Sequence, residues 1–479
     1  MTPLCQQVTY LLFIIEQDSD TYSRRKTMDK EKTLKELARA LDFIERGDEL
    51  TQEEMKAIEK DTIENYTEYY NSGYMDFRKS CTPDGATVEW ASKGEHVYDV
   101  YGNEFIDCIG GFGTYIAGHR NPEIIKYVEH QLHRLTLSST ELIEPLRGYA
   151  CKALAMVTPG DIKFSYLTNG GAEAVEMAIK LAMLSNGAGY FISTVHGFHG
   201  KSIGALSMTG NDVFRERYYP NLLPKVQFIE HGNAEALETA ISNLEAIGEH
   251  VTAFICEPVQ GESGFIIPPK GYLKDVREIC SKHGVLWIAD EIQTGLGRTG
   301  KLWGQDRDGV AADIMTFGKV SSGGAIPCTG IAYTQEVFDK SGLADNPFIL
   351  GSPTFGGNAI ACSALLSVIN YIVKNDIPKT VAEKGAYYLE GLKKIAEGRP
   401  HVDDVRGIGL MLALEFDSPE YGWEVSKEMF AQNVMVAGTL NNARVIRIEP
   451  PAIQEYETID KVIAAMDKAL AAVEARWDK

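Results

Sequence analysis

The feature that most constrains the fold is a regular alternation of strand and helix patterns between about residues 120 and 350. Short apolar runs predict strands, and amphipathic runs predict helices. The strands are expected at 189–193, 251–256, 285–290 and 313–317, and the helices at 172–184 and 272–283. Because parallel strands need a crossover between them, this alternation is typical of a mainly parallel sheet covered by helices. The middle of the chain is therefore predicted to be α/β.

The two ends of the chain show different patterns. Apolar residues recur every three to four positions between 30 and 75, which predicts helices there. The turn Tyr101-Gly102-Asn103 predicts a hairpin between strands at 97–100 and 104–107. After about residue 360 come long helices, strands at 409–416 and 444–448, and a last helix at 459–475. These parts predict a second, smaller α+β unit.

Composition excludes several classes of protein. The chain has 479 residues, of which 44% are hydrophobic, and this length suggests two or three domains. A net charge of -20 argues against nucleic-acid binding. No apolar run approaches the ~18–20 residues of a membrane helix, so no membrane association is expected. Eight scattered cysteines without a CxxC pair predict reduced thiols, a cytoplasmic location and no metal site.

The N-terminus carries a separate expectation. The apolar run 8–15 lacks a basic segment before it, which argues against a signal peptide. Met28 precedes a charged helical pattern. Residues 1–27 are therefore predicted to be a disordered tail or the product of a mis-assigned start codon, with an ordered extension as the alternative.

Three chemically useful side chains follow three of the apolar runs. Glu257 and Asp290 lie at or just beyond the ends of two runs, and Lys319 follows another. Ligands bind at the carboxyl ends of the strands in an open parallel sheet. We therefore expect these side chains to share one site.

The residue types at these positions suit pyridoxal phosphate. Lys319 sits in a run of small residues that lets a flat cofactor approach, and a lysine amine forms imines. A buried carboxylate such as Asp290 keeps a pyridine nitrogen protonated. The segment Asn169-Gly170-Gly171-Ala172-Glu173 opens a predicted helix, whose first N–H groups can bind a phosphate. Such a loop, followed along the chain by an acid and then by a lysine, predicts a pyridoxal-phosphate site.

This set of motifs resembles the class III aminotransferases over about the last 430 of the 479 residues. The resemblance implies the pyridoxal-phosphate-dependent transferase fold type I, α/β, with a large domain built on a mostly parallel sheet and a small α+β domain. The expected boundaries are 28–110 for a helical extension and part of the small domain, 111–355 for the large domain, and 356–479 for the rest of the small domain.

The resemblance also implies roles for residues. Lys319 and Asp290 are the expected catalytic residues, and Gln293 matches a glutamine beside the ring oxygen of the cofactor. The segment around Phe198 and His199 resembles the one whose aromatic ring stacks on the cofactor, with Ile292 on the opposite face. The expected phosphate loop comprises Gly170, Gly171 and Ala172. It departs from the family pattern Asn-Ser-Gly-Thr-Glu because both hydroxyls are missing.

Further residues are matched to substrate binding and assembly. Thr354 matches a threonine that reaches the phosphate of the neighbouring subunit, which implies a homodimer whose active site is completed across the interface. Arg447 matches the arginine that binds the α-carboxylate of the acceptor, and Glu262 matches the acid that covers it. Glu257 belongs to the same substrate-side motif.

The segments 107–113, 118–122 and 437–443 look like those of the putrescine aminotransferase subgroup. That likeness implies an amine and a 2-oxo acid as substrates: putrescine and 2-oxoglutarate, giving 4-aminobutanal and glutamate. The residues after Lys319, Val-Ser-Ser-Gly-Gly, depart from the subgroup's Ala-Leu-Gly-Gly-Gly. An ornithine- or acetylornithine-type aminotransferase and a weakly active binding homologue stay open as alternatives.

One motif is misleading. Residues 295–300 spell GxGxxG after a strand, but a dinucleotide site needs a helix next, and 301–306 lack a helical pattern. We expect a loop there.

Overall fold

The structure is a computed structural model that describes residues 28–47, 49–80, 87–139 and 141–477. The prediction for residues 1–27 lies outside this part of the chain. Contacts divide the protein into two units, 1–64 and 65–479. The first unit contains α2 (Lys30–Arg46) and most of α3 (Gln52–Asn65), so the helices expected near the N-terminus are present.

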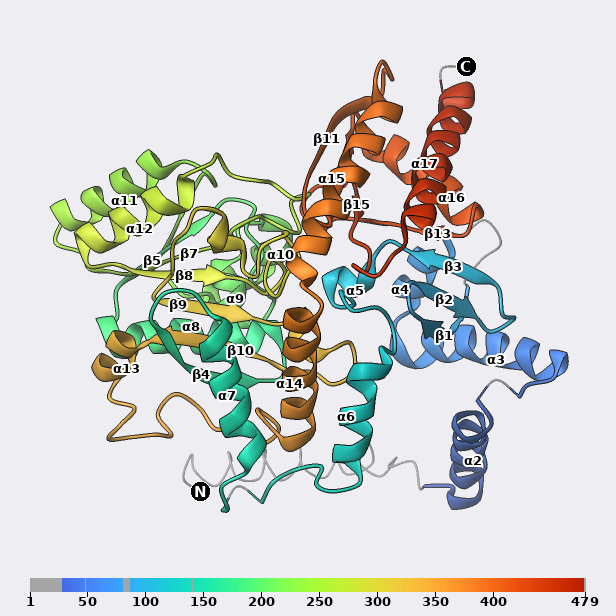
Figure 1. Ribbon diagram of the computed structural model, residues 1–479, viewed down its shortest axis with the longest axis horizontal. Coiled ribbons are helices and arrows are strands. Elements are labelled where there is room, and N and C mark those ends of the chain that lie inside the picture. Colours follow the sequence, from blue (N-terminus) through green and yellow to red (C-terminus); the bar gives the residue numbers. More distant parts are fainter. Residues whose placement is uncertain (1–27, 48, 81–86, 140, 478–479) are drawn as a thin grey trace, which may run out of the picture. The chain divides into compact units, whose positions relative to one another are not determined.

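A seven-stranded sheet forms the centre of the second unit (Figure 1). Its strands, in spatial order, are β4 (Ile162–Thr168), β10 (Thr329–Thr334), β9 (Ile314–Phe317), β8 (Leu286–Asp290), β7 (Val251–Cys256), β5 (Tyr190–Thr194) and β6 (Val226–Ile229). Strands β6, β5, β7, β8 and β9 pair in parallel. Only β10 runs against its two neighbours within this sheet. The predicted mostly parallel sheet is confirmed.

Helices cover both faces of this sheet, and successive strand residues alternate between the two cores. Ala253 and Ile255 of β7 pack in one core with α8 (Gly171–Asn186) and α13 (Gln335–Ser341). Phe254 and Cys256 pack in the other core. That second core includes α7 (Pro145–Val157), α11 (Ala234–Ala246), α12 (Tyr272–His283) and α14 (Ala359–Lys374). Burial on both faces explains why the central strands are mostly apolar instead of alternating between apolar and polar residues.

The small domain is assembled from both ends of the second unit. One of its sheets pairs β1 (Glu89–Lys93), β2 (His96–Asp99) and β3 (Glu104–Asp107) with β13 (Val434–Met435). Its other sheet contains β11 (Val402–Ile408), β12 (Met411–Phe416), β15 (Val445–Ile448) and β14 (Ala437–Gly438). The long helices here are α15 (Ile377–Ala396), α16 (Pro419–Ala431) and α17 (Tyr456–Trp477). The expected hairpin is confirmed as the antiparallel pair of β2 and β3.

Shorter elements connect these parts. They are a π-helix (Tyr66–Tyr70), α4 (Ser72–Ser80), α5 (Gly110–Gly113), α6 (Pro122–Leu132), α9 (Ile203–Met208), α10 (Asp212–Arg215), and 3-10 turns at Glu216–Asn221, Gly304–Arg307 and Lys319–Ser322. Residues 295–300 form turns, as expected for a loop. In the described part of the chain, no single helix has the length and apolarity needed to cross a membrane. The pair α14 and α15 meets those limits together, but it is bent by 66°.

Candidate active site

The carboxyl ends of β7, β8 and β9 lie side by side, because these strands are parallel neighbours (Figure 1). Asp290 is the last residue of β8, Glu257 follows β7 directly, and Lys319 follows β9 by two residues. Asp290 and Glu257 are buried, and Lys319 is half-buried. The structure therefore brings these three predicted residues to one edge of the sheet.

Lys319 adopts an uncommon backbone conformation. Gly318 before it is extended, whereas Lys319 has a φ of 46° and opens a 3-10 turn. The hydroxyl of Ser322 donates to the Lys319 carbonyl at 2.7 Å and closes this turn. The left-handed region costs an L-residue roughly 1–2 kcal/mol. Such strain persists where the surrounding structure imposes it, and it is frequent at functional sites.

Asp290 forms a buried pair with His199. Its Oδ2 lies 2.6 Å from Nδ1 of His199, and its Oδ1 accepts hydrogen bonds from Thr316 Oγ1 at 2.7 Å and from the Ile292 amide at 3.2 Å. Burial raises the pKa of Asp290, but the hydrogen bond and charge of His199 outweigh it, so that pKa is lowered. Burial lowers the pKa of His199, but Asp290 outweighs it, so that pKa is raised. Both effects favour an ionised carboxylate at Asp290.

Glu257 ties the Phe198 segment to the end of β7. Its two carboxylate oxygens accept hydrogen bonds from the amides of Phe198 and Gly261, each at 2.9 Å. Burial raises the pKa of Glu257, and the nearby charge of His199 lowers it. Burial is the larger effect, so the pKa is raised to about 7. Phe198 itself is half-buried, and its ring meets Phe214 edge-on at 6.2 Å.

The start of α8 and Ile292 lie close together. A Cβ added to Gly171 would stand 3.1 Å from Ile292 Cδ1, and one added to Gly318 would stand 3.0 Å from the same atom. Ile292 therefore packs directly on the backbone of both glycines. Gly170 is the N-cap residue of α8 and provides no side-chain cap. The first N–H groups of a helix have no intrahelical acceptor, so this end can bind an anion.

Arg447 and Glu262 form a buried ion pair with two parallel hydrogen bonds. Arg447 Nη1 and Nη2 donate to the two Glu262 oxygens at 3.0 and 2.7 Å. Arg447 Nε donates to the Gly438 carbonyl at 2.9 Å, and the Leu440 amide donates to Glu262 at 3.1 Å. Burial raises the pKa of Glu262, but the charge and hydrogen bonds of Arg447 outweigh it, with a further contribution from Lys319, so that pKa is lowered.

Gln293 makes a contact that the sequence did not predict. Its Nε2 donates to both carboxylate oxygens of Glu449, at 3.1 and 3.0 Å. Glu449 is fully buried and directly follows β15, two residues after Arg447. The signal was present, because residues two apart on a strand point to the same face. The same strand pattern that carries Arg447 therefore points to Glu449.

Thr354 is exposed and lies in an irregular segment before α14. Arg147 of α7 donates from Nε to the Gly357 carbonyl at 3.0 Å, which ties this segment to α7. Within the described residues, the Thr354 hydroxyl makes no hydrogen bond, so this side chain has no hydrogen-bond partner in its own chain.

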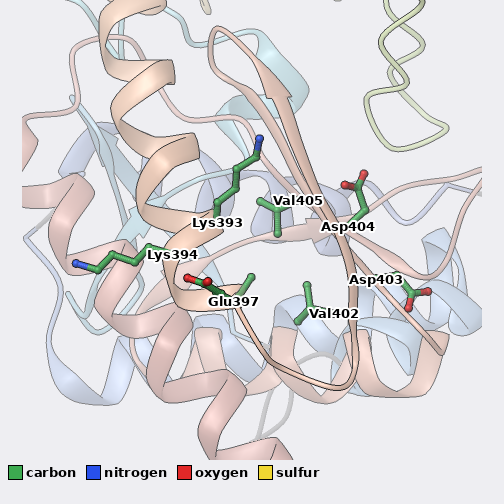
Figure 2. Close-up of a pocket in the computed structure, with 8 residues that line it drawn as sticks. Lys393, Lys394, Glu397, Val402, Asp403, Asp404 and Val405 are labelled. Atoms are coloured by element: carbon green, nitrogen blue, oxygen red, sulfur yellow. The ribbon is translucent and has the colours of Figure 1, made fainter.

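A surface hollow of about 470 Å³ lies elsewhere, between the end of α15 and β11 (Figure 2). Its lining includes Lys393, Glu397 and Asp403. Asp403 and Asp404 pair with Arg444 and Arg406 respectively. These carboxylates are already matched by arginines, and no group of three or more metal-ligating side chains occurs in the described ranges. We therefore do not assign the hollow to the active site.

Comparison with known proteins identifies the family of this chain. The family model "Aminotransferase class-III" matches residues 86–470. Ornithine aminotransferase from Toxoplasma gondii is 30% identical with a TM-score of 0.78, covering 90% of this chain and 100% of that one. An (S)-enantioselective omega-transaminase from Thermomicrobium roseum is 29% identical with a TM-score of 0.76, covering 81% and 93%. Acetylornithine aminotransferase from Elizabethkingia anophelis is 26% identical with a TM-score of 0.69, covering 81% and 94%.

The chain thus belongs to the class III aminotransferases, and its fold is the pyridoxal-phosphate-dependent transferase fold type I. Members of this family use pyridoxal phosphate and act on an amine and a 2-oxo acid.

Proposed function

We propose that this class III aminotransferase moves an amino group from putrescine to 2-oxoglutarate, giving 4-aminobutanal and glutamate. The observation that carries the proposal is the buried pair of Arg447 and Glu262. 2-Oxoglutarate has an α-carboxylate that a guanidinium can bind through two parallel hydrogen bonds. A diamine has none, and Glu262 then keeps Arg447 from being an unpaired buried charge. The pair of Arg447 and Glu262 therefore suits an enzyme that binds first a cationic diamine and then an anionic 2-oxo acid.

The residues at the sheet edge fit pyridoxal phosphate. The donors at the start of α8 would bind its phosphate, and Asp290, kept ionised by His199, would hold the proton on its ring nitrogen. Phe198 and Ile292 would lie on the two faces of the ring, and Gln293 beside its oxygen. When bound, the cofactor supplies an aldehyde that captures amines and a ring that accepts electrons.

Lys319 Nζ would hold the aldehyde carbon of the cofactor. Once the donor amine has taken its place, the same nitrogen would move a proton between the donor carbon and the cofactor carbon. The half-buried position of Lys319, at the end of the sheet and in a strained backbone, supports this role.

We also propose that two copies of the chain form the working enzyme, with Thr354 serving the neighbouring active site. Large apolar side chains are exposed in the segments that precede Arg147 and Gly357, two residues joined by a hydrogen bond, which suits a surface covered by a second copy. They are Leu142 at 77%, Ile143 at 100%, Phe348 at 77% and Phe355 at 59% exposure. A cytoplasmic location agrees with the free thiols of the described cysteines.

An ornithine- or acetylornithine-type activity is the second candidate. The similarity to the Toxoplasma and Elizabethkingia enzymes favours it as much as the diamine activity. Ornithine also presents a terminal amine, so the pair of Arg447 and Glu262 is compatible with both donors. The third reading, a weakly active binding homologue, is disfavoured because Lys319, Asp290 and Gln293 lie together in the fold.

A panel of amine donors with 2-oxoglutarate, measured as glutamate formed, tests the proposal. Putrescine and cadaverine should support the highest turnover, with Lys319→Ala as the inactive control. Turnover confined to ornithine or N-acetylornithine would establish the second candidate and reject the diamine activity. No turnover with any donor, in a protein that binds pyridoxal phosphate, would support the binding homologue.

A further inference from the structure

The loop between β14 and β15 contacts both members of the pair formed by Arg447 and Glu262. Gly438, the last residue of β14, accepts a hydrogen bond from Arg447 Nε at 2.9 Å. The amide of Leu440 donates to Glu262 Oε2 at 3.1 Å, and the amide of Asn441 donates to the Glu262 carbonyl at 2.9 Å. The loop therefore holds Glu262 by its side chain and by its backbone while that residue covers Arg447.

The Leu440 amide favours one of the two states of this pair. Three hydrogen bonds reach the Glu262 carboxylate, two from Arg447 and one from Leu440. When an acceptor carboxylate takes the two Arg447 donors, Glu262 has to move away and loses the Leu440 amide as well. A contact that is made in one state only stabilises that state. The loop therefore affects how readily an anion replaces Glu262 at the arginine.

The side chain of Asn441 fixes the position of this loop. Its Nδ2 donates to the His196 carbonyl at 2.6 Å, and its Oδ1 accepts from Asn211 Nδ2 at 2.9 Å. The hydroxyl of Ser263, the residue after Glu262, donates to the same His196 carbonyl at 2.6 Å and accepts from Asn441 Nδ2 at 3.4 Å. One amide side chain thus ties the loop to segments that lie 178 and 245 positions away along the chain.

The anchoring point at His196 belongs to the candidate active site. His196 has a φ of 62° and lies two residues before Phe198, the proposed stacking residue. A non-glycine residue keeps such a φ where the surrounding structure imposes it, and this is frequent at functional sites. Asn441 and Ser263 both donate to the His196 carbonyl and so help to hold it. Asn441 therefore joins the loop over Arg447 to the segment that carries Phe198.

We infer that Asn441 is a positioning residue that sets how strongly Glu262 competes with an acceptor carboxylate for Arg447. It acts by holding the loop where the Leu440 amide reaches Glu262 Oε2. In the described part of the chain, the Asn441 side chain makes no hydrogen bond to Arg447 or Glu262, so its effect passes through the loop. This inference deepens the proposed function and rests on it, because it concerns the exchange of Glu262 for the acceptor.

The binding of glutarate to the cofactor-loaded enzyme tests this inference without turnover. Glutarate carries the two carboxylates of 2-oxoglutarate but no ketone, so it cannot react, and calorimetry gives its Kd. Asn441→Ala should lower that Kd by about 3- to 10-fold, because it weakens a hydrogen bond that keeps the charged Glu262 carboxylate in place. General damage to the site would weaken glutarate binding, so tighter binding separates this role from a structural one.

A double-mutant cycle shows whether Asn441 acts through Glu262. Glu262→Ala removes the competing carboxylate and should also lower the Kd of glutarate, and in that background Asn441→Ala should have no further effect. The inference is overturned by a Kd that Asn441→Ala leaves unchanged or raises, and equally by a gain of the same size with and without Glu262. If Glu262→Ala itself does not tighten binding, Glu262 does not compete for Arg447 and the inference fails with that premise.

Asn442→Ala is the matched control. It removes the same side chain from the next position of the loop, where that side chain contacts Glu415 and the Arg444 amide. Its Kd for glutarate should equal that of the unmutated enzyme, and a gain equal to that of Asn441→Ala would contradict the assignment, since any loosening of the loop would then suffice.

A second variant covers the case in which Asn441→Ala does not fold. Ser263→Ala removes the other side-chain donor to the His196 carbonyl and is then measured in its place, with the same expectation and the same cycle. Glutarate binding does not depend on which amine is the donor, so its result is separate from that of the donor panel.

Discussion

Replacing Gly170 by serine should tighten the binding of pyridoxal phosphate. The usual family pattern has a serine at this position, and here the hydroxyl is absent. The structure shows that the backbone accepts one. Gly170 has φ -143° and ψ 151°, which any residue adopts, and a Cβ added to it meets no atom within 4 Å. The new side chain therefore has room at the start of α8.

The expected gain follows from the hydrogen bond that is restored. A hydrogen bond to a charged group contributes about 1.5–3 kcal/mol. Fixing the serine rotamer costs roughly 0.5 kcal/mol of that amount. The net gain of about 1–2.5 kcal/mol corresponds to a Kd that is about 5- to 60-fold lower. Serine in place of glycine at an N-cap changes helix stability by only a few tenths of a kcal/mol.

The assay is a titration of the cofactor-stripped protein with pyridoxal phosphate, followed by the visible absorbance of the bound cofactor. Gly170→Ala is the matched control, because it adds the Cβ without the hydroxyl and should give no tightening. An unchanged or higher Kd for Gly170→Ser would refute the reasoning. So would an equal gain in Gly170→Ala, because the hydroxyl would then be irrelevant.

Three further predictions follow from the site. Arg447→Ala should abolish turnover with 2-oxoglutarate. The half-reaction with putrescine, measured as the loss of visible absorbance of the cofactor, should be reduced less. Equal losses in both half-reactions would show that Arg447 is structural, and Glu262→Gln is the control because it keeps the arginine. An inactive Lys319→Ala chain mixed with a Thr354→Ala chain should recover activity in mixed dimers, because both lesions then fall in one active site and the other site is intact. A fully active monomer by light scattering would reject the shared site. The pKa of His199 is raised by Asp290, so this pair stabilises the folded protein fully below pH ~6.5, and the stabilisation is lost as pH rises through the raised pKa. The melting temperature of the unmutated protein should therefore decline over that range, and that of His199→Asn should lack this decline. The same dependence of melting temperature on pH in both proteins would contradict the assignment.

Much of the fold was predictable because burial on both faces leaves a strong signal. The runs at β7, β8 and β9 are mostly apolar, and the structure places strands there within one residue of the expected bounds. The direction of each strand in the sheet was not predictable. A strand such as β10 has the same composition whether it runs parallel or antiparallel to its neighbours. Two-residue strands such as β13 leave no periodicity to detect.

The site was predictable in its residues more than in its contacts. Asp290 and Lys319 follow apolar runs, and strand ends in a parallel sheet converge. The partner of Asp290 depends on tertiary packing, because His199 lies 91 positions away. The contact of Arg447 with Glu262, 185 positions apart, was expected only from the family resemblance. The positive φ of Lys319 is likewise imposed by the fold, because lysine has no intrinsic preference for that region.

The charge state of each acid in this site depends on what kind of partner it has. Asp290 and Glu262 contact a cationic side chain directly, and the pKa of each is lowered despite burial. Glu257 and Glu449 receive hydrogen bonds only from amide groups, and the pKa of each is raised because amides do not offset the burial of a charge. The pKa of Glu257 is about 7, so its charge varies near neutral pH. The charge of Asp290 also raises the pKa of Glu257, so an ionised Asp290 favours a neutral Glu257 beside it. The two carboxylates of this sheet edge therefore differ in charge because only Asp290 has a cationic partner.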